Sequence, residues 1–163
     1  MMALSNPRRV PVSIPSSRRF FLGAATAAAA QRVMGANDRV NLVQIGIGGR
    51  GRDHLNNYTA LPELTNIIGV CDVNQAARER AQAIVTKAGQ LKPREYDNMK
   101  QVFADKEVDA VSMATPNHWH ALGTIWACEA GKDVYVEKPA SHNIYEGQRM
   151  VEVARKTKRM VQV

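Results

Sequence analysis

The stretch Val43-Gln-Ile-Gly-Ile-Gly-Gly-Arg-Gly51 decides the fold, because it runs an apolar strand into the pattern G-x-G-x-x-G at the start of a helix. In such a turn Gly46 permits a tight bend, Gly48 lets a pyrophosphate approach the backbone, and Gly51 allows close packing of helix on strand. The first turn of the helix also offers free N–H groups and partial positive charge to phosphates. The stretch therefore predicts a phosphate-binding turn, although glycine-rich loops also occur for purely conformational reasons.

An acidic residue stands where a bound dinucleotide needs one. A second apolar strand ends in Asp72, 21 residues beyond Gly51, close to the spacing at which a carboxylate meets the adenosine ribose. Such a carboxylate accepts hydrogen bonds from ribose hydroxyls and repels a 2′-phosphate, so we expect NAD, with NADP less favoured. Neighbouring basic residues are able to reverse that preference, and Asp72 also suits a helix N-cap. Gly49 and Arg50 are expected to add phosphate contacts.

The rest of the chain alternates short apolar runs with longer amphipathic stretches, as in parallel strands joined by crossover helices. Strands are predicted near residues 40–46, 66–72, 108–114, 133–137 and 160–163. Helices are predicted over about 49–61, 74–88, 98–104, 117–130 and 143–158, with N-caps at Asn74, Asn117 and Asn143 and stops at Gly89 and Gly131. The pattern predicts an α/β fold over residues 37–163, a doubly wound parallel sheet of the Rossmann type. The last strand breaks off as it begins, which favours a fragment.

A polar loop follows the third predicted strand, at the carboxyl edge of the sheet where open α/β folds bind ligands. Its sequence is Thr115-Pro116-Asn117-His118-Trp119-His120. We expect this loop to touch the nicotinamide end of a cofactor. A metal ion held by the two histidines is the alternative, but no third ligand lies nearby, so no metal site is predicted.

A second polar loop, Glu137-Lys138-Pro139, follows the fourth predicted strand at the same edge. A lysine beside a cationic nicotinamide ring and partly shielded from water suits proton exchange with a substrate. An ordinary surface lysine before a turn-forming proline is the alternative. His54 and His142 have no comparable context and are predicted to be simple helix and loop residues.

Residues 1–36 have the order of an export signal. An Arg18-Arg19 pair is followed by Phe20-Phe21-Leu22 and by a run of small residues that reaches Ala30, as in twin-arginine signals. The apolar run is shorter than the roughly 18 to 20 residues that span a bilayer. We therefore expect the twin-arginine export machinery as a partner, and a periplasmic protein or one tethered by an uncleaved signal. A basic tail with no targeting role is the alternative.

Much of the positive charge belongs to this leader. The net charge is +7, and residues 1–30 contain four arginines and no acidic residue, so +3 remains without them. The remaining charges interleave with Asp and Glu along predicted helices, which excludes nucleic acid as an expected partner. Cys71 and Cys128 lack the spacing of a metal site or a disulfide framework and are predicted to be small buried residues.

Four motifs in order resemble the Gfo/Idh/MocA (glucose-fructose oxidoreductase/inositol dehydrogenase) family over about residues 39–163. They are Gly46-x-Gly48-x-x-Gly51, Asp72, Thr115-Pro116-Asn117-x-x-His120 and Glu137-Lys138-Pro139. The resemblance implies that a larger α+β domain follows, carrying the substrate site and mediating any homo-oligomer. Further catalytic residues, an Asp and a His, belong to that second domain, so these 163 residues are not expected to be active alone.

The resemblance also implies roles for single residues. Lys138 lies near the reactive carbon of the nicotinamide and the substrate hydroxyl, and assists proton removal as hydride leaves. Pro139 follows a cis peptide bond that holds the lysine in place. Asn117 and His120 line the cofactor cleft.

Three functions are consistent with these observations. The first is an NAD(P)-dependent oxidoreductase acting on the CH–OH group of a sugar or cyclitol. The second is a glycosidase of the same family that uses tightly held NAD for transient oxidation and re-reduction. The third is a non-catalytic nucleotide-binding module. All three require that the loops at one end of the sheet converge on one bound nucleotide.

Overall fold

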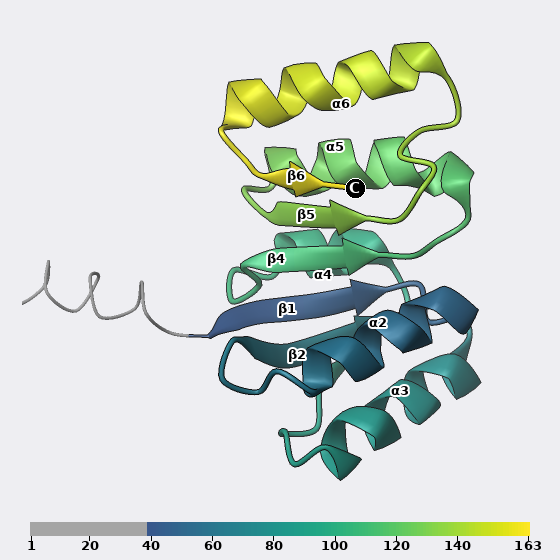
Figure 1. The fold of residues 1–163 in the computed structure, drawn as a ribbon, viewed down its shortest axis with the longest axis vertical. Helices are drawn as coiled ribbons and strands as arrows, with labels where there is room; N and C mark the ends of the chain where they lie inside the picture. The colour runs from purple at the N-terminus through teal and green to yellow at the C-terminus, as the bar shows by residue number, and fades with distance from the viewer. Residues whose placement is uncertain (1–38) are drawn as a thin grey trace, which may run out of the picture. The chain divides into compact units, whose positions relative to one another are not determined.

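The computed structural model describes residues 39–163, which contain one parallel sheet of six strands in the order β3-β2-β1-β4-β5-β6 (Figure 1). The strands are β1 (Val40–Ile45), β2 (Thr65–Cys71), β3 (Arg94–Tyr96), β4 (Ala110–Met113), β5 (Asp133–Val136) and β6 (Val161–Gln162). The predicted doubly wound fold is confirmed. The predicted leader, residues 1–36, lies outside the described residues.

Helices cover both faces of this sheet (Figure 1). One face carries α2 (Gly49–Thr59) and α3 (Gln75–Lys87); the other carries α4 (Met99–Ala104), α5 (His120–Glu129) and α6 (Ile144–Thr157). Within residues 39–163, no helix is sufficiently long and apolar to cross a membrane.

Two hydrophobic clusters form the core, one on each face of the sheet. Leu42 packs with Leu55 of α2 and Ala81 of α3, whereas Val43 packs in the cluster that includes Ala127 of α5. Leu42 and Val43 are neighbours in β1, and consecutive strand residues point to opposite faces. The central strand is therefore apolar on both sides, as expected of a parallel sheet covered by helices.

Helix ends follow the predictions with one exception. Asn74 and Asn143 cap α3 and α6, their side chains accepting from the backbone N–H groups of Ala77 and Glu146. The predicted N-cap at Asn117 is wrong, because a short 3-10 turn, η2 (Asn117–Trp119), precedes α5. The Asn117 amide instead lies 3.3 Å from Nδ1 of His142.

The sheet order reverses beside β1, which pairs with β2 on one side and with β4 on the other. The chain leaves β1 toward the α2 face and leaves β4 toward the α5 face, so the two loops diverge at the carboxyl edge. In open α/β sheets ligands bind in the crevice at such a switch point. The predicted site residues follow β1, β2, β4 and β5 at this edge.

Candidate functional site

The turn after β1 is fixed by contacts that exclude larger side chains. Gly46 has φ +78°, and a Cβ built there would lie 2.8 Å from the backbone of Ala114. A Cβ on Gly51 would overlap the carbonyl oxygen of Gly46, so α2 packs directly on the turn. A Cβ on Gly48 or Gly49 would meet nothing within 4 Å. The space above the first turn of α2 is therefore open.

The start of α2 leaves its backbone donors available. Gly48, the N-cap, makes no side-chain capping hydrogen bond, and the first turn contains no acidic residue. The first N–H groups of a helix have no partner within the helix and carry partial positive charge. This turn therefore suits an anionic group such as a pyrophosphate.

Asp72 is tied to both the glycine turn and the start of α3. Its Oδ2 accepts a hydrogen bond from the Ile47 N–H at 2.7 Å, and its Oδ1 accepts from the Asn74 N–H at 2.9 Å. Each carboxylate oxygen has a further lone pair able to accept a ligand hydroxyl. The carboxylate is thus held in a fixed position at the carboxyl end of β2.

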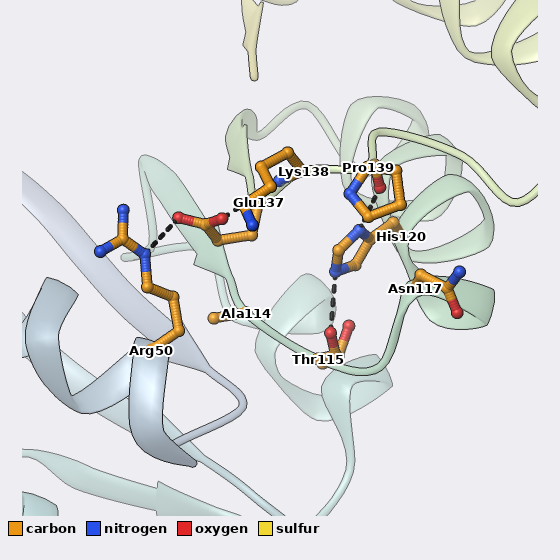
Figure 2. Close-up of a pocket in the computed structure, with 8 residues that line it drawn as sticks. All are labelled: Arg50, Ala114, Thr115, Asn117, His120, Glu137, Lys138 and Pro139. Carbon is orange, nitrogen blue, oxygen red and sulfur yellow. Dashed lines mark hydrogen bonds and ion pairs between the residues drawn. The ribbon is translucent and has the colours of Figure 1, made fainter.

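The predicted site residues divide among three cavities rather than lining a single cleft. The first, here called the Asp72 cavity, has a volume of about 520 Å³ and is lined by Gly46, Asp72, Thr115 and Pro116 among others. The second, the Lys138 cavity, has about 580 Å³ and is lined by Arg50, Ala114, Thr115, Asn117, His120, Glu137, Lys138 and Pro139 (Figure 2). Gly48 and Gly49 line a smaller depression of about 200 Å³.

Thr115 lines both the Asp72 cavity and the Lys138 cavity. Its Oγ1 is buried and has no hydrogen-bond partner within the described part of the chain. A buried polar atom without a partner is uncommon in folded proteins. Because both cavities are lined by Thr115, they adjoin each other and fit an extended polar ligand with two ends, such as a dinucleotide.

A buried carboxylate stands at the edge of the Lys138 cavity. Glu137 Oε1 accepts from Arg50 Nε at 2.7 Å and from His54 Nε2 at 2.8 Å, and Glu137 Oε2 accepts from the Lys138 N–H at 3.2 Å. Figure 2 shows Arg50 reaching from α2 toward this carboxylate. The hydrogen bond from Arg50 is the main reason that the pKa of Glu137 falls to about 2. Glu137 therefore carries a negative charge at neutral pH.

His54 lies in helix α2, as predicted, but it makes buried contacts that the sequence did not indicate. Its side chain is only 5% exposed and bridges Glu137 to β4, where Nδ1 lies 3.2 Å from the Ser112 hydroxyl. The Ser112 oxygen also accepts from the Tyr58 hydroxyl at 3.2 Å. Glu137 lies 83 positions along the chain from His54, which explains why local context gave no signal. The four-residue spacing of Arg50 and His54, which puts both on one face of α2, is compatible with a shared partner but does not identify one.

His120 contacts the backbone of both polar loops. It is buried, and its Nδ1 and Nε2 lie 2.7 Å from the Pro139 carbonyl oxygen and 2.8 Å from that of Thr115 (Figure 2). Its ring thus lines the cavity while its nitrogens contact backbone. The Lys138–Pro139 peptide bond is cis, as the resemblance implied. Among residues 39–163, no three His, Cys, Asp or Glu side chains are grouped to hold a metal ion.

Comparison with known proteins agrees with this geometry. A family model described as an oxidoreductase family with an NAD-binding Rossmann fold, GFO_IDH_MocA, matches residues 40–163. The chain belongs to this family. Its described residues are the N-terminal NAD(P)-binding domain of a Gfo/Idh/MocA protein, as the motifs predicted.

Similar proteins extend well beyond the matched region. A glycosyl hydrolase family 109 protein of Saccharopolyspora erythraea is 35% identical over 128 residues, which are 76% of this chain and 28% of that protein. The structure of an NAD-binding protein from Listeria innocua is 32% identical with a TM-score of 0.65, covering 76% of this chain and 33% of that one. A WlbA dehydrogenase of Chromobacterium violaceum, solved with NADH and UDP-GlcNAcA, is 27% identical with a TM-score of 0.67 over 76% of this chain and 34% of that one. This chain therefore spans about a third or less of the length of these Gfo/Idh/MocA-like proteins.

Proposed function

We propose that the domain binds NAD with its adenosine in the Asp72 cavity, its pyrophosphate over the first turn of α2 and its nicotinamide in the Lys138 cavity. The observation that carries this proposal is Thr115, which lines both cavities and whose buried hydroxyl has no hydrogen-bond partner in the described part of the chain. The open space above Gly48 and Gly49 leaves room for the phosphates. When bound, the nicotinamide ring supplies the hydride acceptor.

The proposed preference for NAD over NADP rests on Asp72. Its carboxylate is held by two backbone N–H groups and keeps lone pairs for the ribose hydroxyls. A 2′-phosphate at the same position would stand against this negative charge. We therefore expect Asp72→Asn to weaken NAD binding while improving NADP binding.

For the whole protein we propose oxidation of a CH–OH group on a sugar or cyclitol. Lys138 lies in the loop after β5 and lines the Lys138 cavity, where the nicotinamide is proposed to bind. In this proposal its Nζ receives the proton of the substrate hydroxyl, which is general base catalysis. The dehydrogenase solved with NADH and UDP-GlcNAcA, which matches over 76% of this chain, supports a sugar-like substrate.

The second candidate is a glycosidase that oxidises its substrate transiently and then re-reduces it. The similarity to a glycosyl hydrolase family 109 protein, at 35% identity, favours this alternative. The two activities are separated by supplying the full-length protein with a glycoside and with a free sugar. Release of sugar without net accumulation of NADH identifies the glycosidase, whereas NADH accumulation identifies the dehydrogenase.

Cofactor binding is testable with the chain itself. The chain has two tryptophans, Trp119 and Trp126, and both line the Asp72 cavity. Titration with NAD is therefore expected to change the intrinsic fluorescence, and Asp72→Ala is expected to weaken the binding that it reports. Glu129→Gln, an exposed change at the end of α5, serves as a control. A folded sample that binds no NAD at millimolar concentrations would contradict the proposal.

We also propose export by the twin-arginine route, on the basis of Arg18-Arg19 and the small-residue run that follows. The test is a fusion of residues 1–38 to a folded reporter in a bacterium with a twin-arginine system. Export is expected for the native sequence and is expected to be lost when both arginines are changed to lysine. A reporter that stays in the cytoplasm with the native sequence would contradict export.

A further inference from the structure

The Glu137 carboxylate has two side-chain partners that differ in exposure. Arg50 comes from the first turn of α2, where the phosphates are proposed to bind, and its side chain is 60% exposed. His54 lies one turn further along the same helix and is 5% exposed. When a pyrophosphate is bound beside it, the exposed Arg50 side chain is able to pair with a phosphate instead of with Glu137. The buried histidine is the partner that remains in place when Arg50 turns toward a phosphate.

A chain of hydrogen bonds fixes the orientation of the His54 ring. The Tyr58 hydroxyl donates to Ser112 Oγ at 3.2 Å, and Ser112 Oγ lies 3.2 Å from His54 Nδ1. Because an ionised carboxylate only accepts hydrogen bonds, His54 Nε2 donates to Glu137 Oε1, 2.8 Å away. The contact of Nδ1 with Ser112 thus helps to hold the ring with Nε2 facing Glu137, as is common for histidines in functional sites.

The charges around the Lys138 cavity explain why a fixed carboxylate matters there. Among the described residues that line it, Arg50 and Lys138 are cations and Glu137 is the one carboxylate. An oxidised nicotinamide ring is itself cationic, whereas the reduced ring is neutral. Without Glu137 the cavity would present the basic side chains of Arg50 and Lys138 to a cationic ring with no negative charge to offset them, and like charges at short range are unfavourable.

We propose that His54 is a positioning residue that holds the Glu137 carboxylate as a fixed anion in the Lys138 cavity, so that this cavity favours the oxidised over the reduced nicotinamide. The inference rests on the proposed placement of the nicotinamide in that cavity. It assigns His54 and Ser112 a role in setting the balance between the two forms of the cofactor. Neither residue belongs to the four motifs that predicted the site.

The experiment measures the dissociation constants of NAD⁺, NADH and ADP-ribose for the full chain and its variants. Glu137→Gln keeps the shape of the side chain and removes the charge. It is expected to lower the ratio Kd(NADH)/Kd(NAD⁺) tenfold or more, because at an effective dielectric of about 20 a single charge within about 12 Å of the ring has at least this effect. His54→Leu is expected to lower the ratio in the same direction. His54→Gln, which keeps a donor toward Glu137, is expected to restore most of it.

Two controls separate this proposal from simpler effects. Glu107→Gln removes an equivalent charge that is paired with Arg94 at 2.9 Å and precedes the amino end of β4, and is expected to leave the ratio unchanged. ADP-ribose lacks the nicotinamide, so none of the variants is expected to bind it more weakly. Loss of ADP-ribose binding in a variant would mark a folding defect rather than a change at the nicotinamide.

The outcomes distinguish the two proposals. If the wild-type chain binds neither NAD⁺ nor ADP-ribose, the proposed cofactor site fails and this inference fails with it. If ADP-ribose binds normally and Glu137→Gln leaves the ratio unchanged, the inference alone is overturned. If Glu137→Gln lowers the ratio and a folded His54→Leu does not, the role of His54 is overturned. Should His54→Leu fail to fold, Ser112→Ala, which removes the Nδ1 partner, is expected to lower the ratio in its place.

Discussion

The backbone N–H of Ile47 donates to the Asp72 carboxylate at 2.7 Å. This bond joins the phosphate turn after β1 to the residue that directly follows β2, so the two sequence motifs that predicted a dinucleotide are physically connected. Asp72 therefore shapes the turn in addition to facing the proposed ribose position. Substitutions of Asp72 are expected to affect stability and cofactor affinity together.

Asp72→Ala removes the acceptor of two backbone N–H groups. We expect a loss of about 1 to 3 kcal/mol in the free energy of unfolding, the usual cost of leaving such groups without partners. Urea denaturation followed by circular dichroism measures it. Asp72→Asn retains one acceptor oxygen and is expected to lose less. Equal losses for the two variants would show that these hydrogen bonds contribute little to stability.

Gly51→Ala places a methyl group on the carbonyl oxygen of Gly46. Relief requires α2 to move away from the turn, so we expect destabilisation of about 1 to 3 kcal/mol, typical of overpacking. Gly49→Ala is the matched control, because a Cβ there meets nothing within 4 Å. A Gly51→Ala variant as stable as Gly49→Ala in urea would refute close packing at this point.

Glu137 is expected to make stability depend on pH in the acidic range. Its pKa falls from 4.5 to about 2 in the folded protein, chiefly through the Arg50 hydrogen bond. Because the folded pKa is the lower one, the ionised carboxylate stabilises the fold above about pH 4.5, and this contribution is lost as the pH falls toward 2. Urea denaturation at several pH values is expected to show a shallower dependence for Glu137→Gln than for wild type.

Arg50→Gln and Arg52→Gln test the cause of that dependence. Arg50→Gln removes the first cause of the lowered pKa and is expected to weaken the pH dependence, whereas Arg52→Gln, two positions along α2, is expected to leave it as in wild type. If the stability of Arg50→Gln depended on pH as it does in wild type, the hydrogen bond from His54 would be sufficient to keep the pKa of Glu137 low.

Lys132 supports the sheet at the edge away from the site. Its ammonium donates to the carbonyl oxygens of Asp105 and Val108, both at 2.7 Å, and the residue is 6% exposed. Lys132→Met leaves both oxygens without this donor, so we expect a loss of about 1 to 3 kcal/mol in the free energy of unfolding. Lys106→Met, an exposed neighbour, is expected to change stability by less than about 0.5 kcal/mol. NAD affinity measured by fluorescence is expected to be equal in the two variants.

His120 is expected to matter for both stability and cofactor affinity. His120→Ala removes the ring that contacts the carbonyl oxygens of Thr115 and Pro139, and both loops line the Lys138 cavity. We expect lower thermal stability and weaker NAD binding than in His118→Ala, which changes an exposed residue of the same loop. Identical NAD affinity in the two folded variants would limit His120 to a purely structural role.

The fold was largely predictable because its signals are local. The apolar strand that runs into Gly46 and Gly51 and the alternation of strands with helices indicated a doubly wound sheet. β3 was missed because it has only three residues and two of them, Arg94 and Glu95, are charged. Its position follows from pairing with β2, which is not visible in three residues of sequence.

The positions of the site loops were predictable from the sequence, whereas the buried contacts behind them were not. Lys138 and Thr115 follow strands, and the carboxyl ends of parallel strands share one edge, so their proximity followed from topology. The bond from His54 to Glu137 depends on α2 lying across β4 and β5, a tertiary relation that no local pattern encodes. The same applies to the division of the site residues among three cavities, two of which share Thr115.

The short charged strand β3 has a consequence for the behaviour of the protein in solution. It forms one border of the sheet, where unpaired backbone groups invite strands from other molecules to add on. Arg94 of β3 is engaged by Asp105 and Glu107, and Glu95 by Arg78. A strand from another molecule that paired with β3 would have to displace these ion pairs. It would form backbone hydrogen bonds along only three residues. This border is thereby protected against aggregation by edge-to-edge growth.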